Sequence, residues 1–281
     1  MLRKITLGLA ATLMLAAAAS AQTVDEIVAK HIAARGGMAK LKAVKTLRVA
    51  AKRDIQPGLS VPVVMEQSRP NKMRADFTVQ GMVGTLAFDG AAGWQVMPFQ
   101  GNPNPEPMND EMLKEFSADS DIDGPLVDWK EKGNKVELVG KEAVEGTDAY
   151  KLKLTKKTGD VAHIWLDADS WLELKSESKR MVRGTEQELV ALSGDYKEVG
   201  GLMMAHSFQF GPKGQPMLSM TFEKIEINPA LDDARFKMPA APKKADANAP
   251  ADKPENKDAE TKPADKKPIE AVKPPAKPPA R

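Results

Sequence analysis

Short segments in which apolar and polar residues alternate make up most of the chain between residues 46 and 227. In the segment KMRADF, for example, Met73, Ala75 and Phe77 alternate with charged residues, which is the period-two pattern of a strand with one buried face. About a dozen such segments follow one another at close spacing, separated by turns rich in Gly, Pro and Asp. They predict a large antiparallel sheet that curls toward a barrel. The predicted strands span residues 46–53, 61–67, 72–79, 82–89, 93–97, 135–140, 149–156, 162–167, 172–179, 186–192, 202–210 and 217–227.

Three helices are expected beside these strands. Thr23 and Glu26 have the spacing of a capping box, and apolar residues then recur at helical spacing as far as Gly36. A second short helix is predicted over residues 38–44. The proline-rich run 102–107 is expected to break the sheet, and the apolar residues that follow it have helical spacing again. This third helix either covers the barrel as part of a lid or packs on its exterior.

The two ends of the chain differ from its middle. Residues 1–21 have the basic start, the apolar stretch and the small-residue cleavage site of a secretory signal peptide, so we expect export and cleavage after Ala21. An uncleaved N-terminal anchor is the alternative, although the apolar stretch is short for a membrane span. Residues 240–281 consist mainly of Ala, Pro, Lys, Asp and Glu, and such a segment is predicted to be disordered. One domain over residues 22–239 remains between them.

The composition of the chain excludes several classes of function. The chain has no cysteine, so it has no disulfide, no thiol nucleophile, no Cys-based zinc site and no lipidated cysteine of the bacterial lipoprotein type. Residues 22–239 carry 29 basic and 32 acidic side chains. This near-neutral balance, without a basic stripe, argues against nucleic-acid binding.

No group of polar residues has the spacing of a catalytic or cofactor site. His31, His163 and His206 lie far apart in sequence and suggest neither a metal site nor a catalytic triad. Asp167 and Asp169 are most simply the residues of a hairpin turn, in which carboxylates accept backbone N–H groups. The glycine motifs of phosphate loops and nucleophile elbows do not occur. The sequence therefore predicts no enzyme and no cofactor.

One acidic motif suggests a weak metal site. Asp119, Asp121 and Asp123 precede Gly124 in the D-x-D-x-D-G order that opens an EF-hand calcium loop. The position that needs a bidentate glutamate falls on Lys130, so the closing ligand is missing. A weak calcium site and a solvated acidic loop remain the two interpretations.

The block from residue 65 to residue 99 resembles a known family. It contains a strand, the Arg69-Pro70-Asn71 motif, a second strand, an apolar strand, an Asp89-Gly90 turn and a strand that bears Trp94. This order is similar to that of the periplasmic lipoprotein carrier LolA and its relatives. Residues 222–239, FEKIEINPALDDARFKMP, resemble the segment with which these domains end.

The resemblance implies a fold class and a function. The fold would be mainly β (α+β): an incomplete antiparallel β-barrel with an N-terminal helix and a helical lid over an apolar cavity. The protein would be a soluble periplasmic carrier of lipoprotein acyl chains or of another lipid. Its partners would be an acylated lipoprotein or lipid and sorting partners in the inner and outer membranes. We expect a monomer, and without the lipidated cysteine the chain is like the free carrier. The alternative function is a lipid-sensing or protein-interaction module on the same scaffold.

The resemblance also gives Arg69 a role. In LolA-like carriers the arginine of the Arg-Pro-Asn motif hydrogen-bonds the lid backbone and holds the empty cavity closed. The guanidinium group, with five donors in a rigid fork, suits that task, and lysine would not. The alternative is a surface arginine at the start of a strand.

Thirteen of the 15 methionines lie after residue 21. Methionine is unbranched and repacks readily, so it is suited to a surface that accepts ligands of varied shape, although ordinary core packing explains a methionine stripe as well. A barrel that does not close would leave a cavity for such a surface. The expected cavity lining is Met65, Met73, Phe77, Met82, Leu86, Trp94, Met97, Met108, Met112, Phe116, Met204 and Met220.

Overall fold

The computed structural model describes residues 22–240 apart from residues 57, 183 and 216. The chain divides into two units, residues 1–242 and 243–281, and every described residue belongs to the first. The predicted signal peptide lies outside the described residues, and so does the predicted disordered tail beyond residue 240. None of the helices in the described part is long and apolar enough to cross a membrane.

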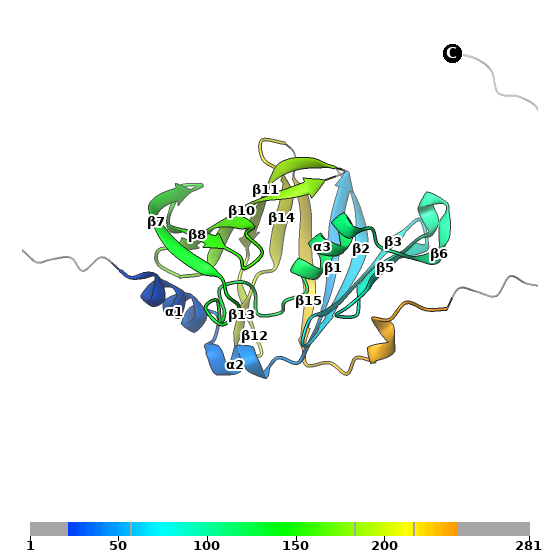
Figure 1. Ribbon diagram of the computed structural model, residues 1–281, viewed down its shortest axis with the longest axis horizontal. Helices are drawn as coiled ribbons and strands as arrows, with labels where there is room; N and C mark the ends of the chain where they lie inside the picture. Colours follow the sequence, from blue (N-terminus) through cyan, green and yellow to red (C-terminus); the bar gives the residue numbers. More distant parts are fainter. Residues whose placement is uncertain (1–21, 57, 183, 216, 241–281) are drawn as a thin grey trace, which may run out of the picture. The chain divides into compact units, whose positions relative to one another are not determined.

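Thirteen strands of the described part form one antiparallel sheet (Figure 1), in the order β6-β5-β4-β3-β2-β1-β15-β14-β11-β10-β9-β8-β7. The C-terminal strand β15 pairs with β1 and so joins the two halves of the sheet. The edge strands β6 and β7 do not pair with each other, so the sheet stays open, as predicted for an incomplete barrel. The strands are β1 (Thr46–Gln56), β2 (Leu59–Ser68), β3 (Lys72–Val79), β4 (Met82–Phe88), β5 (Gly93–Met97), β6 (Asn102–Pro107), β7 (Lys135–Val144), β8 (Thr147–Thr155), β9 (Val161–Asp167), β10 (Glu173–Val182), β11 (Thr185–Gly194), β14 (Ser207–Pro212) and β15 (Leu218–Ile227).

Two details of the strands differ from the prediction. The proline-rich run forms the edge strand β6 instead of breaking the sheet, because an edge strand can turn the donor-free nitrogens of its prolines away from its neighbour. The predicted strand over residues 202–210 is divided into two. Its first part, β13 (Leu202–Met204), pairs with β12 (Lys197–Val199) in a separate small sheet, and its second part, β14, joins the large sheet.

The pairing register separates the side chains of the sheet into two faces. Met65 lies opposite Val49 and Ala75, and Val49 lies opposite Ile225, so these residues share one face, which we call the inner face. Their chain neighbours Arg48, Glu66 and Arg74 share the opposite, outer face, because successive side chains of a strand point to opposite sides.

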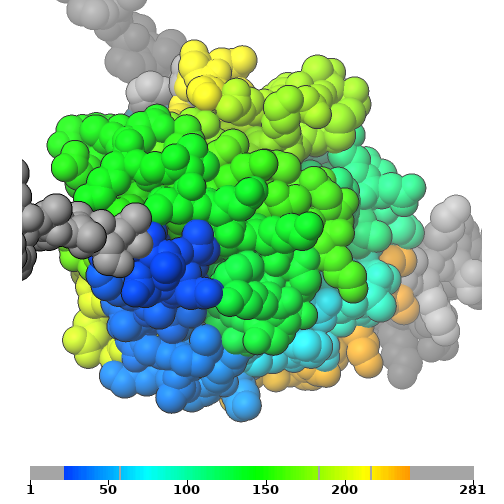
Figure 2. Space-filling model, turned by 60° about the vertical axis from the view of Figure 1, so that its left-hand side comes forward, coloured from blue at the N-terminus to red at the C-terminus, as the bar shows by residue number. Residues whose placement is uncertain are grey.

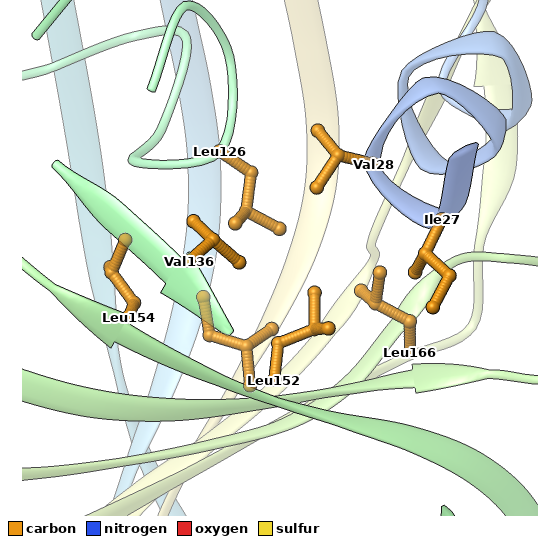
Figure 3. Packing of buried hydrophobic residues seen from close by; sticks show 8 residues of the cluster. Ile27, Val28, Leu126, Val136, Leu152, Leu154 and Leu166 are labelled. Atoms are coloured by element: carbon orange, nitrogen blue, oxygen red, sulfur yellow. The ribbon is translucent and has the colours of Figure 1, made fainter. Parts of the chain in front are cut away.

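Two N-terminal helices cover part of the inner face. The helix α1 (Val24–Ala34) begins with the predicted capping box of Thr23 and Glu26, and α2 (Met38–Ala43) follows it. Figure 3 shows Ile27 of α1 pointing toward Leu166 of β9, and Val28 pointing toward Leu126 in the same cluster. In Figure 2 the two helices (blue) lie against the green middle part of the chain.

The third helix, α3 (Asp110–Ala118), reaches across the inner face. It contacts β3, β4 and β5 on one side and β10 on the other. Residues 119–125, which we call the crossing segment, lead from α3 to two fully buried residues. Leu126 joins the core of α1 and the sheet, and Val127 joins a second core with Leu41 of α2. The end of the crossing segment is therefore anchored in two hydrophobic cores.

The C-terminal residues cover the outer face. Phe236 is completely buried there, and its carbonyl oxygen accepts a hydrogen bond of 2.8 Å from Trp94 Nε1. Glu66, with a relative exposure of 1 %, lies between Arg48 Nε at 2.9 Å and Arg235 Nε at 2.7 Å. An aromatic anchor and a buried carboxylate with two cations thus hold this segment on the sheet.

We expect the substitution Phe236→Ala to lower the free energy of unfolding by about 3–5 kcal/mol, because it leaves a cavity under the C-terminal segment. The neighbouring Met238, with a relative exposure of 48 %, offers a control: Met238→Ala should change stability by no more than about 0.5 kcal/mol. Urea unfolding followed by tryptophan fluorescence measures both values. Equal losses for the two variants would contradict the anchoring role of Phe236.

Candidate functional site

A cavity of about 610 Å³ lies on the inner face, between the sheet and residues 119–126. Its volume is within the range of small-molecule binding pockets. Both halves of the sheet contribute to it, β1, β2 and β3 from one side and β10, β11, β14 and β15 from the other. Its walls are mainly aliphatic, methionine and phenylalanine side chains, including Val49, Met65, Met204, Phe208, Met220 and Phe222.

An irregularity in the pairing of β1 and β15 adds apolar surface to the cavity. Ala50 pairs with Lys224 whereas Ala51 pairs with Phe222, so β15 has one residue more than β1 at this point. The extra residue lets Phe222 and Ile225 both face the cavity, although they are three positions apart. The ring of Phe222 stacks on that of Phe208, with 6.5 Å between the ring centres.

Polar side chains gather at one end of the cavity. His31 is buried, and its Nδ1 lies 2.8 Å from the carbonyl oxygen of Trp171. Burial lowers the pKa of His31 to about 4, against the raising effect of that hydrogen bond, and the charge of Arg35 lowers it further. Burial also raises the pKa of Glu173, although a hydrogen bond from Ser176 and the charge of Arg35 oppose this effect. Part of the Glu173 side chain faces the cavity itself.

Tyr196 closes the same end. Its hydroxyl donates a hydrogen bond of 2.7 Å to the backbone carbonyl oxygen of Glu173. The pKa of Tyr196 is raised, mainly by burial and then by the neighbouring Glu173 carboxyl group. Burial favours the uncharged forms of His31, Glu173 and Tyr196, which line the cavity together with charged residues such as Arg35. This polar end suits the polar part of a ligand.

Arg69 fastens the crossing segment over the cavity. Its Nη1 and Nη2 donate to the two carboxylate oxygens of Asp123 at 2.9 and 2.6 Å. Its Nε donates to the carbonyl oxygen of Val44 at 2.6 Å, and Nη2 also donates to that of Leu41 at 3.1 Å. One planar guanidinium group thus joins the crossing segment to the end of α2.

Asp123 is the buried member of this pair, with a side-chain exposure of 4 % against 24 % for Arg69. Lys42 Nζ lies 2.8 Å from its Oδ2, and Arg35 donates to its backbone oxygen at 2.9 Å. Burial by itself would raise the pKa of Asp123, but hydrogen bonds and charges of Arg69 and Lys42 outweigh it and hold the pKa well below its usual range. The carboxylate therefore stays ionised and bound.

Arg69 lies beside the crossing segment, and its acceptors differ from the expected lid backbone. Toward the crossing segment Arg69 binds the carboxylate of Asp123, and its backbone acceptors lie at α2 and Val44. Sequence reasoning considered Asp123 only as a calcium ligand and missed its pairing with Arg69. A signal for this pairing is present in the sequence. Asp123 follows the helix that could form the lid, and the guanidinium group of Arg69 needs an anionic partner.

The structure places four of the twelve expected lining residues at this cavity. Met65, Met73, Met204 and Met220 line the cavity. The remaining expected residues are not among its lining residues in the described part. Phe77 instead packs on Phe99, with 5.6 Å between ring centres, and Met82 is exposed at the rim of the sheet. The others that do not line the cavity are Leu86, Trp94, Met97, Met108, Met112 and Phe116.

The expectation for Trp94 is wrong for a reason of register. Trp94 lies opposite Ala87, which lies opposite Arg74, and Arg74 lies opposite Glu66 on the outer face. The ring therefore points away from the cavity and packs under the C-terminal segment. Period-two alternation separates the two faces of a strand, but it does not say which face borders the cavity.

The calcium interpretation is not supported. Asp119 pairs with Arg180 at 3.0 Å, Asp121 with Lys132 at 2.5 Å, and Asp123 with Arg69. The three carboxylates thus bind three different cations of the protein, and no group of acidic or histidine side chains within the described residues could hold a metal ion. The hairpin interpretation of Asp167 is confirmed, because its Oδ1 accepts from the backbone N–H groups of Asp169 and Ser170.

We expect the buried His31 to make stability depend on pH. Its pKa is 6.5 in an unfolded chain and about 4 here, so the folded state resists protonation. Its contribution is complete above pH 6.5 and is lost as the pH falls from 6.5 to 4, by ~3 kcal/mol in total. The contribution of Asp123 to stability changes only below about pH 4, because the pKa of its carboxyl group is lowered from 3.8.

Urea unfolding at pH 7.0, 5.5 and 4.5 measures this dependence. The variant His31→Gln should show a flatter profile than the wild type over this interval, whatever its absolute stability. Met238→Ala, an exposed substitution that changes no titratable group, serves as the control and should keep the wild-type slope. Parallel profiles for His31→Gln and the wild type would refute the assignment.

Comparisons with known proteins place the fold. No protein-family model matches the chain, and no curated protein matches its sequence. Among solved structures, a LolA superfamily protein from Nitrosomonas europaea aligns over 77 % of this chain and 98 % of its own, with 14 % identity and a TM-score of 0.52. A DUF1329 family protein from Desulfovibrio piger aligns over 76 % of this chain and 97 % of its own, with 12 % identity and a TM-score of 0.51.

At these identities the likeness concerns the backbone fold. The open antiparallel sheet and the near-complete coverage of both solved chains agree with the resemblance in the Arg69-to-Trp94 block. The chain has a LolA-like fold.

Proposed function

We propose that the protein is a soluble periplasmic binding protein that carries the acyl chains of a lipoprotein or of another lipid in its inner cavity. The observation that carries this proposal is the cavity of about 610 Å³, with apolar walls and a roof held by ionic contacts. The predicted signal peptide supports export, and the LolA-like fold agrees with a cavity of this kind.

An apolar cavity of this size supplies binding energy without covalent chemistry. Each CH₂ group that leaves water for such a site contributes about 0.8 kcal/mol, so a long acyl chain binds strongly. Release then requires a partner with a better site, which we propose to be an acceptor at a membrane. Methionine and phenylalanine side chains of the walls repack around chains of different shape.

In this proposal Arg69 is the latch of the empty state. An entering chain displaces the crossing segment and separates Arg69 from Asp123. Loading therefore loses the free energy of this ion pair, and unloading regains it. The closed state is stabilised by the pair, and the loaded state by contacts with the chain. Arg69 therefore favours release.

Native mass spectrometry of the protein purified from periplasm tests the proposed function. We expect bound acyl species on the wild type and none on Ala191→Trp, since Ala191 lines the cavity and the indole ring would fill it. Ala143→Trp places the same ring on an exposed position of β7 and should keep the ligand. Wild-type protein that is always empty would contradict the proposal.

The latch has its own test. Arg69→Leu removes the hydrogen bonds to Asp123, each worth about 1.5–3 kcal/mol for a charged group, so loaded protein should release lipid to acceptor vesicles at least tenfold more slowly. Arg69→Lys keeps the charge but loses the bidentate geometry. Its release rate should therefore lie between those of the wild type and Arg69→Leu. A release rate unchanged in Arg69→Leu would contradict the proposed latch.

A wild type that binds lipid but never transfers it to the vesicles would favour a sensing module on the same fold.

A further inference from the structure

A second cavity, of about 720 Å³, lies beside the first, between α3 and the strands β8 to β10. Leu154 and Ile164, both members of the core under α1, give it an apolar floor together with Ala162. Basic residues such as Lys114 and acidic residues such as Asp160 are also part of its lining, and these two form an ion pair. The arrangement of an apolar floor and a charged border suits a hydrocarbon chain that ends in a polar group.

The two cavities have a common border. The residues that line both are Asp119, Asp121, Gly124, Pro125, Glu173, Ser176, Ser178 and Arg180. Four of them belong to the crossing segment and four to β10, so the border, which we call the passage, lies between the crossing segment and β10. Ser176 and Ser178 contribute small side chains on the β10 side of this border.

Arg180 closes this passage. Its Nη1 lies 2.8 Å from Glu115 Oε2 of α3, and its Nη2 lies 3.0 Å from Asp119 Oδ1 at the start of the crossing segment. The side chain is about three-quarters buried, and it ties the strand below to the helix and segment above. On the opposite border of the first cavity, Gln67 of β2 donates to the carbonyl oxygen of Asp119 at 3.1 Å. Asp119 is therefore held from both walls.

We propose that Arg180 is a second latch, which separates the two cavities, and that its release joins them into one space for a ligand with two hydrocarbon chains. This inference rests on the proposed function. One chain of a diacyl lipid would occupy the cavity under Arg69, and the other would pass over Ser176 and Ser178 into the second cavity. A ligand with a single chain fits the first cavity alone and leaves the pairs of Arg180 intact.

The two latches differ in what they control. Arg69 binds Asp123 at the end of the crossing segment and acts on every ligand that enters the first cavity. Arg180 binds the beginning of that segment and the preceding helix, so it acts only on a ligand that needs the passage. Arg180 thus determines selectivity for the number of chains.

The experiment uses two lipids with the same headgroup and the same acyl chain, phosphatidylglycerol with two chains and lysophosphatidylglycerol with one. The full-length protein is titrated with each lipid, and native mass spectrometry gives both dissociation constants. Arg180→Gln removes the charge that must be displaced, so affinity for the two-chain lipid should rise about tenfold. Affinity for the one-chain lipid should stay within twofold of the wild type.

A matched set of variants separates the latch from a general effect of charge. The pair Glu115→Gln with Asp119→Asn removes the same contacts from the other side and should reproduce the shift of Arg180→Gln. Adding Arg180→Gln to that pair should then change nothing further, because the three residues act as a unit. Lys52→Gln, which breaks an exposed ion pair with Glu223 away from both cavities, should leave both affinities unchanged.

The outcomes are distinguishable. If the wild type and the variants bind both lipids but Arg180→Gln changes the two affinities equally or not at all, the second latch is wrong and the proposed function stands. If neither the wild type nor any variant binds either lipid, the result contradicts the proposed function and also the inference that rests on it. Unfolding curves identify any variant that has lost its fold, and the acidic-side pair then provides the same measurement.

Discussion

The contact between Arg69 and Asp123 is the constraint on which the rest of the site depends. A carboxylate exposed to only 4 % is costly to bury, and it is tolerated because one guanidinium and one ammonium group surround it. Breaking such a pair without replacing it leaves an uncompensated charge, so the crossing segment has no stable position halfway open. In the proposed latch the cavity therefore has two states, closed with the ion pair formed or open with Asp123 exposed to water.

The two ends of the segment over the cavity are held by different forces. Leu126 and Val127 are anchored in apolar cores that do not depend on a ligand. Within residues 119–125, Ile122 packs against the second core, and the segment makes polar contacts with Arg69, Lys42, Arg35, Gln67, Lys132, Asn134 and Arg180. Polar contacts can be exchanged for contacts with water when a ligand enters. We expect the segment to move as a flap with its hinge at Leu126 and with α3 following its free end.

Much of the fold follows from local patterns. The alternation of Met73, Ala75 and Phe77 predicts β3 with its observed bounds, and the capping box at Thr23 marks the start of α1. The strand β6 could not be predicted in this way, since its prolines are acceptable only at a sheet edge and the edge is a property of the whole topology.

The site was less predictable for a related reason. The side of a strand that borders the cavity depends on pairing across the sheet, and for this reason Met65 lines the cavity and Trp94 does not. The pairs Arg69–Asp123 and Arg180–Asp119 join residues more than fifty positions apart, and spacing within a sequence carries no signal for them. Arg69 could be found because a motif of a known family contains it. Arg180 lies in an ordinary strand pattern and became visible only beside the two cavities.

Hydrogen exchange of the loaded and the empty protein tests the central claim most directly. In the closed state the backbone N–H of Asp123 donates to Asp121 Oδ1 and that of Gly124 donates to the carbonyl oxygen of Asp121. The account predicts that loading with phosphatidylglycerol accelerates exchange in residues 119–125 and leaves the amides of the core around Leu126 protected. Exchange in residues 119–125 that is unchanged or slower in the loaded protein would contradict an ionic latch that opens on binding.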